Sequence, residues 1–345
     1  MDFIRHDLKD FKGYVPGKQP KGTDVVKLNT NENPYPPSPQ VTACLRSLDT
    51  NQFRRYPSSL CDELRDACSE AFEIPSENIL AGNGSDDLLT MIYRAFMNPD
   101  DTAVTAFPTY TLYQDLAVIR GCKFKRQERN ADYSLPQELF ASNAKLCLVA
   151  NPNSPTGTQT DKKTLRQLAE DLNGILVIDE AYADFASDNC LDLWKMPNVI
   201  ILRTLSKSYS LAGIRLGFAF AQRSLLDDMI KVKDSYNVNL ITQMTGAEAI
   251  RDTAWTQQNI EQIKTQRKRA EKFLTQQGWV VTPSEANFVW ARPSKPNAED
   301  IYNQLIERNI LVRYFPGPMT GTHLRITIGT PDEMDTLFNA IREIS

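Results

Sequence analysis

Short apolar runs alternate with helical patterns over much of the chain. The runs that are short and β-branched enough to be buried strands lie at 103–107, 146–150, 175–178 and 199–202. Apolar residues have helical spacing at 60–72, 86–97 and 161–172. Strands that alternate with helices are typical of a mainly parallel sheet covered by helices on both faces. We therefore expect a large α/β domain.

The pattern changes toward the C-terminus. A long, charge-rich amphipathic stretch at 244–277 predicts one connecting helix with an exposed face. Beyond it, strand-like runs lie at 279–282, 287–291, 310–313 and 324–328, with one helical pattern at 298–309. These elements predict a smaller α/β domain.

The first 40 residues are rich in Pro, Gly and Asn. Proline lacks a backbone N–H, so such a stretch predicts an extended arm that lies against another part of the protein. We expect three parts: an arm at 1–40 that packs on the small domain and on a partner, a large domain at 41–240, and a small domain at 241–345.

The composition narrows the class of protein. The chain has 345 residues, 41% of them hydrophobic, and a net charge of -4 with scattered Lys and Arg, which argues against nucleic-acid or membrane partners. No apolar run would span a bilayer, and the N-terminus lacks a signal-peptide pattern. Six separated cysteines without a Cys-x-x-Cys pair read as reduced thiols, and two histidines offer little for a metal site. We expect a cytoplasmic protein without a metal.

The segment 203–217 carries the clearest chemistry. It follows the strand-like run at 199–202, and Thr204, Ser206 and Arg215 are suited to hold a phosphate. Lys207 lies among them, and nearby cations would make it a usable amine nucleophile. Pyridoxal phosphate needs such a lysine beside a phosphate site. A solvated basic loop is the alternative.

Further candidates follow other strands, where ligands bind in open α/β sheets. Asp179 ends the run at 175–178 and could pair with a pyridinium nitrogen, or could cap a helix or bind a metal. Asn153 and Ser154 lie in a proline-rich turn at 151–157, where a cis bond before Pro155 is possible, and could hydrogen-bond a ring hydroxyl.

The loop Gly82–Asp87 precedes a helical pattern, so its backbone N–H groups and Ser85 could bind an anion. A dinucleotide-binding loop is the competing interpretation, but the third glycine of Gly-x-Gly-x-x-Gly is missing. Tyr110 could stack on an aromatic ring, and Tyr56 could reach a phosphate. Arg313 and Arg325 lie on strand-like runs and could bind a substrate anion together.

These motifs together resemble the fold-type-I pyridoxal-phosphate aminotransferases, most closely the histidinol-phosphate aminotransferase family. The most specific motifs are Asp-Glu-Ala-Tyr at 179–182, Arg-Thr-Leu-Ser-Lys at 203–207, Gly-Ile-Arg-Leu-Gly at 213–217 and Tyr-Asn-Val-Asn at 236–239. The resemblance extends from the arm to 324–330. It implies a large domain with a mainly parallel mixed sheet, a smaller C-terminal domain, and pyridoxal 5'-phosphate as cofactor.

The resemblance also implies the site residues. Lys207 would bind the cofactor and move the proton, Asp179 would pair with the pyridine nitrogen, and Tyr182 with the phenolic oxygen. The other cofactor contacts would be Tyr110 on the ring, with Thr204, Ser206, Arg215, Gly84, Ser85 and Asp86 at the phosphate. Tyr56 would reach the phosphate from the partner in a homodimer with shared sites. Tyr14, Asn33, Arg313 and Arg325 would face a phosphorylated amino alcohol or a 2-oxo acid.

One position departs from the family pattern. Asn usually precedes Pro-Thr-Gly and contacts the phenolic oxygen, whereas here Ser154 does so, with Asn153 one residue earlier. The implied reaction is the transamination of L-histidinol phosphate with 2-oxoglutarate in histidine biosynthesis. A threonine-phosphate decarboxylase, an aromatic aminotransferase and, more remotely, a Rossmann-type oxidoreductase are alternatives. A catalytically silent protein of the same fold is less consistent with Lys207, Asp179, Tyr182 and Arg215 occurring together.

Overall fold

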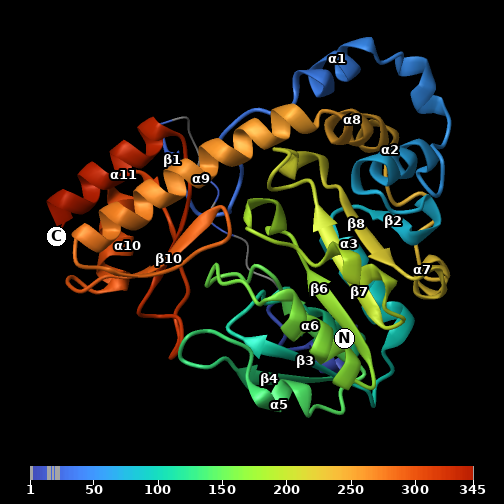
Figure 1. Cartoon of the computed structure of the whole chain (residues 1–345), viewed down its shortest axis with the longest axis horizontal. Helices are drawn as coiled ribbons and strands as arrows, with labels where there is room; N and C mark the ends of the chain where they lie inside the picture. The colour runs from blue at the N-terminus through green and yellow to red at the C-terminus, as the bar shows by residue number, and fades with distance from the viewer. Residues whose placement is uncertain (1–2, 14–16, 18, 20–23, 345) are drawn as a thin grey trace.

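The computed structural model describes residues 3–13, 17, 19 and 24–344. Figure 1 shows two domains, joined by a long helix that crosses from one to the other. The large domain is built on a seven-stranded sheet in the order β2-β8-β7-β6-β5-β3-β4. Its strands are β2 (Ile79–Gly82), β3 (Thr102–Phe107), β4 (Lys123–Glu128), β5 (Leu146–Ala150), β6 (Ile175–Asp179), β7 (Val199–Thr204) and β8 (Gly217–Ala221).

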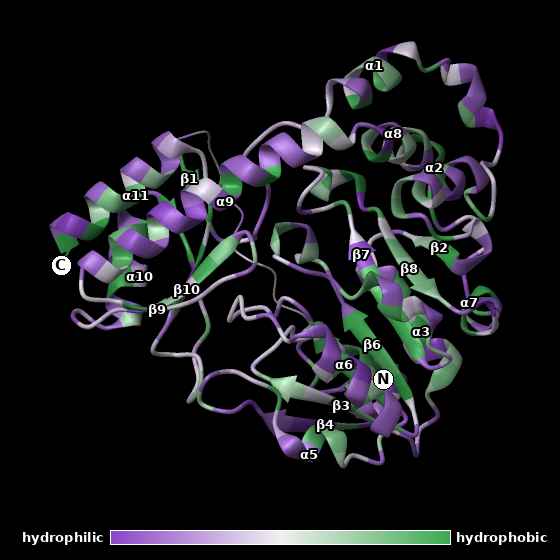
Figure 2. Ribbon diagram, viewed as in Figure 1, coloured by the Kyte–Doolittle hydropathy of each residue, from purple (hydrophilic) through white to green (hydrophobic). Residues whose placement is uncertain are grey.

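Neighbouring strands from β7 to β4 are parallel, and only β8 runs antiparallel to its neighbours. The predicted mainly parallel mixed sheet is therefore confirmed. Consecutive residues of a strand point to opposite faces, and Val177 and Ile178 of β6 accordingly join different apolar clusters. Helices cover both faces, which explains why the sequence shows continuous apolar runs; Figure 2 shows β6 and β8 mostly in the hydrophobic colour.

The helices of this part of the chain are α1 (Pro39–Ser47), α2 (Asp62–Phe72), α3 (Ser85–Phe96), α4 (Leu112–Arg120), α5 (Gln137–Phe140), α6 (Lys162–Asp171) and α7 (Arg223–Ile230). The predicted helices at 60–72, 86–97 and 161–172 are confirmed as α2, α3 and α6, whereas the other helices of this part of the chain were not predicted. Short 3-10 turns lie at His6–Leu8, Thr50–Arg54, Ser76–Asn78, Ala183–Phe185, Leu191–Lys195 and Ala212–Ile214.

The predicted single helix at 244–277 is wrong, because it consists of α8 (Leu240–Arg251) and α9 (Thr253–Gln276). Asp252 separates them with ψ 65°, and its carboxylate accepts from the backbone N–H of Trp255, which caps α9. The hydroxyl of Ser38 donates to the same carboxylate at 2.5 Å. The side chains of Ala247 and Ile250 in α8 join the core of the large domain. We therefore propose Asp252, rather than residue 240, as the domain boundary.

The C-terminal domain contains a four-stranded antiparallel sheet in the order β12-β13-β10-β9. These strands are β9 (Val280–Thr282), β10 (Phe288–Arg292), β12 (Arg313–Tyr314) and β13 (Leu324–Thr327), covered by α9, α10 (Ala298–Glu307) and α11 (Pro331–Ile344). The sequence patterns did not predict α11. The single strand expected at 310–313 is two strands, because β11 (Ile310–Leu311) pairs instead with β1 (Val26–Lys27) of the arm.

The start of the arm contacts α4 of the large domain, where Arg5 donates to the carbonyl of Ile119. From β1 to Ser38 the arm is irregular and contacts both domains, through the pairing of β1 with β11 and through the bond from Asn33 to Ser208. Pro39 then opens α1, because a proline in the first turn of a helix leaves no required N–H unpaired. The arm therefore ends at Ser38, two residues before the predicted boundary at residue 40. Within the described part of the chain, no helix has the length and apolar character that crossing a bilayer requires.

Candidate active site

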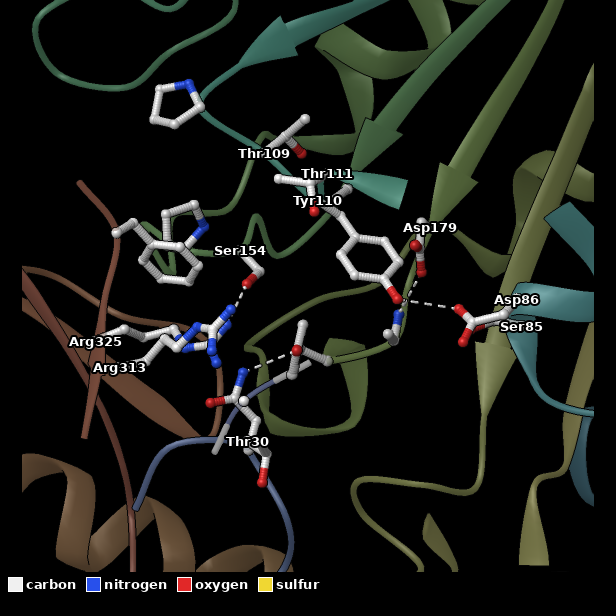
Figure 3. A pocket seen from close by; sticks show the side chains of 18 of the residues that line it. Thr30, Ser85, Asp86, Thr109, Tyr110, Thr111, Ser154, Asp179, Arg313 and Arg325 are labelled. Atoms are coloured by element: carbon white, nitrogen blue, oxygen red, sulfur yellow. Dashed lines mark hydrogen bonds between the residues drawn. The ribbon is translucent and has the colours of Figure 1, made fainter. Parts of the chain in front are cut away.

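The carboxyl ends of the central strands meet at one edge of the large sheet, where a cavity of about 480 Å³ opens. The last residues of β3, β5, β6 and β7 all line it: Phe107, Ala150, Asp179 and Thr204. The arm and the C-terminal domain close the other side. Figure 3 shows Ser85 and Asp86 at one end, Arg313 and Arg325 side by side at the other, and Tyr110 and Asp179 between them.

Most of the residues selected from the sequence line this one cavity. They are Ser85, Asp86, Tyr110, Ser154, Asp179, Tyr182, Thr204, Ser206, Lys207, Arg215, Arg313 and Arg325. Parallel strands explain the grouping, because their carboxyl ends share an edge even when they are far apart in sequence.

One end of the cavity has the groups of an anion site. The hydroxyls of Thr204 and Ser206 lie 3.0 Å apart, and Nη1 of Arg215 lies 3.5 Å from Oγ of Ser206. The N-terminus of α3 adds backbone N–H groups, since no side chain caps it. Its preceding residue, Gly84, has φ 86°, and a Cβ there would come within 2.7 Å of Arg215. Glycine thus lets the loop approach the guanidinium closely.

Asp179 lies at the end of β6 with only 5% of its surface exposed. Its Oδ2 accepts from the hydroxyl of Tyr113 at 2.7 Å, and its Oδ1 accepts from the backbone N–H of Ala181. Burial raises the pKa of Asp179 to about 6, and these hydrogen bonds oppose the increase. Burial also raises the pKa of Tyr113 well above its usual value, so this phenol remains a donor. A cationic partner in the cavity would stabilise the carboxylate further.

Lys207 extends into the cavity from the loop after β7. Its Nζ donates to the carbonyl of Thr30 at 3.3 Å and lies 5.8 Å from the centre of the Tyr182 ring. A buried network holds the same loop. Ser208 donates to Asp184, which accepts from Arg203 at 2.6 Å, and Arg203 also donates to Glu180 at 2.8 Å. These hydrogen bonds fix the backbone of the loop that carries Lys207.

The other end of the cavity carries two arginines on neighbouring strands. Arg313 and Arg325 are directly paired in the register of β12 and β13, so they share one face of the sheet. The guanidinium of Arg325 donates to Oγ of Ser154 at 3.0 Å and to the carbonyl of Asn29 at 2.8 Å. Like charges directly opposite repel, so this arrangement suits an anionic ligand that contacts both.

Comparison with known proteins identifies the family. Residues 23–341 match the family model of aminotransferase class I and II. The chain belongs to this aminotransferase family. It is 42% identical to histidinol-phosphate aminotransferase 1 of Trichormus variabilis, over 99% of each chain. It is 41% identical to the histidinol-phosphate aminotransferase of a Synechocystis species, over 100% of this chain and 99% of that one.

A solved aminotransferase has the same fold. The histidinol-phosphate aminotransferase of Sinorhizobium meliloti, crystallised with pyridoxal-5'-phosphate, superposes with a TM-score of 0.86 at 24% identity. The superposition covers 92% of this chain and 91% of that one. The expected fold-type-I architecture is thereby confirmed.

Several predicted site residues of this aminotransferase lie outside the cavity lining. Nδ2 of Asn153 donates to the carbonyl of Pro108 and to Thr156 in the buried turn, so Ser154 is the better-placed candidate for a ring hydroxyl. The peptide bond before Pro155 is cis. Nδ2 of Asn33 donates to the carbonyl of Ser208 at 3.0 Å, which makes it a support for the lysine loop. Tyr14 lies outside the described residues.

Tyr56 also lies away from the cavity. It is 81% exposed and stacks on Tyr236 at 4.4 Å between ring centres. Its proposed contact with a cofactor phosphate stays a prediction.

The sequence patterns missed other residues of the site. Tyr113 contacts Asp179, while Thr30 and Asn31 of the arm contact Lys207 and Tyr182. A tyrosine in an amphipathic helix usually packs in the core, so the pattern did not mark Tyr113 as a site residue. Its position three residues after Tyr110 was the one indication that it lies near the site. The arm contacts depend on the path of an irregular segment, which no periodicity reports.

We predict that Asp179 makes the ligand-free protein less stable as the pH rises. Its folded pKa of about 6 exceeds the ordinary value of 3.8, so its stabilising contribution is present below pH 3.8 and is lost as the pH rises through about 6. Asp179→Asn should remove that loss, which amounts to roughly 3 kcal/mol for about two pKa units. Thermal unfolding of both proteins from pH 4 to 8 tests this. A stability difference that did not grow across the window would contradict it.

Proposed function

We propose that the chain is a pyridoxal-phosphate-dependent aminotransferase that uses L-histidinol phosphate as amino donor and 2-oxoglutarate as acceptor, in histidine biosynthesis. The observation that carries the proposal is one cavity with an anion site at one end, paired arginines at the other, and Lys207 and Asp179 between them. The identity of about 40% to full-length histidinol-phosphate aminotransferases supports the choice of substrate.

The residues present fit the cofactor. Thr204, Ser206, Arg215 and the N-terminus of α3 would hold its phosphate, and Tyr110 would contact the ring. Asp179 would face the pyridine nitrogen, where its buried carboxylate would gain the cationic partner that offsets its burial. Tyr182 and Ser154 would bind the phenolic oxygen, and Nζ of Lys207 would hold the aldehyde carbon. Bound there, the cofactor supplies a protonated ring that accepts the electron pair of the substrate α-carbon.

The side chains of the protein perform the proton transfers. Nζ of Lys207 would act as the base that removes the proton from the substrate α-carbon and later returns one. Asp179 would keep its charge through the cationic ring nitrogen together with the hydrogen bonds from Tyr113 and the Ala181 N–H. The arm and the C-terminal domain limit water access from the other side.

Arg313 and Arg325 explain how one site accepts two substrates in turn. Histidinol phosphate and 2-oxoglutarate differ in shape, but both present an anionic group that a guanidinium binds through parallel hydrogen bonds. A threonine-phosphate decarboxylase of the same fold would release carbon dioxide, whereas a transaminase conserves the carbon skeleton of both substrates.

We further propose a homodimer, supported by the exposed, stacked Tyr56 and Tyr236. Tyr56 would reach the cofactor phosphate of the partner. All six cysteines are free thiols, which is consistent with the proposed cytoplasmic location.

Lys207→Ala should lower transamination of histidinol phosphate by at least about 10³-fold, because both the covalent attachment and the base are lost. Glutamate formation measured with 2-oxoglutarate provides the assay. Lys231→Ala is the matched control, because Lys231 is an exposed lysine whose partner Asp228 lies on α7, in the large domain. Substantial residual activity in the Lys207 variant would refute the assignment of the lysine.

Arg325→Ala should reduce kcat/KM for histidinol phosphate by roughly 30- to 10³-fold, as expected for charge-assisted hydrogen bonds. Cofactor retention, measured by absorbance after dialysis, should change little. Arg325→Lys should recover only part of the loss, because lysine lacks the planar fork. A variant that released cofactor but kept its apparent substrate affinity would contradict the role.

The shared site predicts complementation between subunits. Mixing Lys207→Ala and Tyr56→Ala subunits after reversible dissociation should create dimers in which one site has both native residues. At limiting cofactor, we expect activity above that of either variant alone. A protein that sediments as a monomer, or a mixture without any gain, would argue against the shared site.

A further inference from the structure

The arm segment Asn29–Asn33 contacts several proposed functional groups. The carbonyl of Asn29 accepts from Arg325, and the carbonyl of Thr30 accepts from Lys207. The segment also contributes the side chain of Asn31. Nδ2 of Asn31 donates to the hydroxyl of Tyr182 at 2.9 Å. This is a contact of the arm with the phenol that is proposed to act on the cofactor.

Asn31 is held too firmly to be an incidental neighbour. It is 1% exposed and has φ 56°, a left-handed conformation that asparagine tolerates better than most residues. Its backbone N–H donates to Oγ1 of Thr327 at 3.0 Å, and its carbonyl accepts from Nδ2 of Asn287 at 3.0 Å. The C-terminal sheet therefore fixes the direction of the Asn31 side chain.

The same contacts determine which end of the amide faces Tyr182. The hydroxyl of Thr327 accepts from the Asn31 N–H, and its own proton is donated to Oδ1 of Asn31 at 2.9 Å. In this arrangement the oxygen of the amide faces Thr327 and Nδ2 points to Tyr182. A phenol has one proton. Because its oxygen accepts from Asn31, that proton remains available on the cavity side.

We propose that Asn31 is a positioning residue that makes Tyr182 a hydrogen-bond donor toward the phenolic oxygen of the cofactor. The inference rests on the proposed function, in which Tyr182 faces that oxygen. The edge-to-face contact of Tyr182 with Phe288, at 5.1 Å between ring centres, fixes the ring plane. Asn31 then fixes the direction of the proton. Accepting one hydrogen bond also makes the phenol a stronger donor of its own.

The test is the pH midpoint at which the visible absorption of the cofactor-loaded protein changes. A hydrogen bond donated to the phenolic oxygen draws charge from it and lowers that midpoint. Tyr182→Phe should raise the midpoint by about one pH unit. Asn31→Gly keeps the left-handed backbone but removes the donor, and should raise it by roughly half a unit or more.

Two controls separate this effect from changes in the backbone. Asn309→Gly makes the same substitution at an exposed residue with φ 59°, and should not move the midpoint. In the Tyr182→Phe background, Asn31→Gly should cause no further shift, because the two residues act through one hydrogen bond. If Asn31→Gly does not fold, Thr327→Val, which removes the hydroxyl that orients the amide, should also raise the midpoint.

The outcomes distinguish the two levels of the proposal. An unchanged midpoint in Tyr182→Phe would overturn the proposed role of Tyr182. If Tyr182→Phe shifts the midpoint but Asn31→Gly does not, the positioning role of Asn31 alone is overturned. The same holds if Asn31→Gly causes its full shift even in the Tyr182→Phe background.

Discussion

Keeping a carboxylate charged inside the protein is the constraint on which this site depends. Asp179 ends a strand that is buried on both faces, and burial alone favours its protonated form. The hydroxyl of Tyr113 and the N–H of Ala181 offset part of that cost. The rest would come from a cationic ring nitrogen, so the protein and its cofactor would stabilise each other's charges.

The other elements of the site are arranged around that position. The proposed phosphate-binding groups of residues 204–215 come from the next strand and the loop after it, and the α3 terminus supplies the donors beyond them. The C-terminal domain then places Arg313 and Arg325 at the opposite end. The arm joins the two domains, because β1 pairs with β11 while Thr30 and Asn31 contact Lys207 and Tyr182. The arm thus supports both Arg325, proposed to bind substrate, and Lys207, proposed to transfer the proton.

Features that depend on strand order and residue chemistry could be predicted from the sequence. Continuous apolar runs revealed the strands, and the polar residues that follow them, such as Asp179 and Thr204, were selected as ligand-binding candidates. Tyr113 and Asn31 could not be predicted, because each acts through a partner that is distant in the chain. The break at Asp252 was also missed, because an aspartate on the exposed face of an amphipathic helix is common. The pairing of β11 with the arm instead of β13 depends on tertiary packing that periodicity does not report.

The most direct test of the proposed activity is an absorbance spectrum of the purified, cofactor-loaded protein, recorded before and after addition of L-histidinol phosphate without any oxo acid. We predict a visible band that bleaches with histidinol phosphate and returns when 2-oxoglutarate is added. A band that histidinol phosphate leaves unchanged would contradict the substrate. The absence of any band after addition of pyridoxal phosphate would contradict the cofactor site itself.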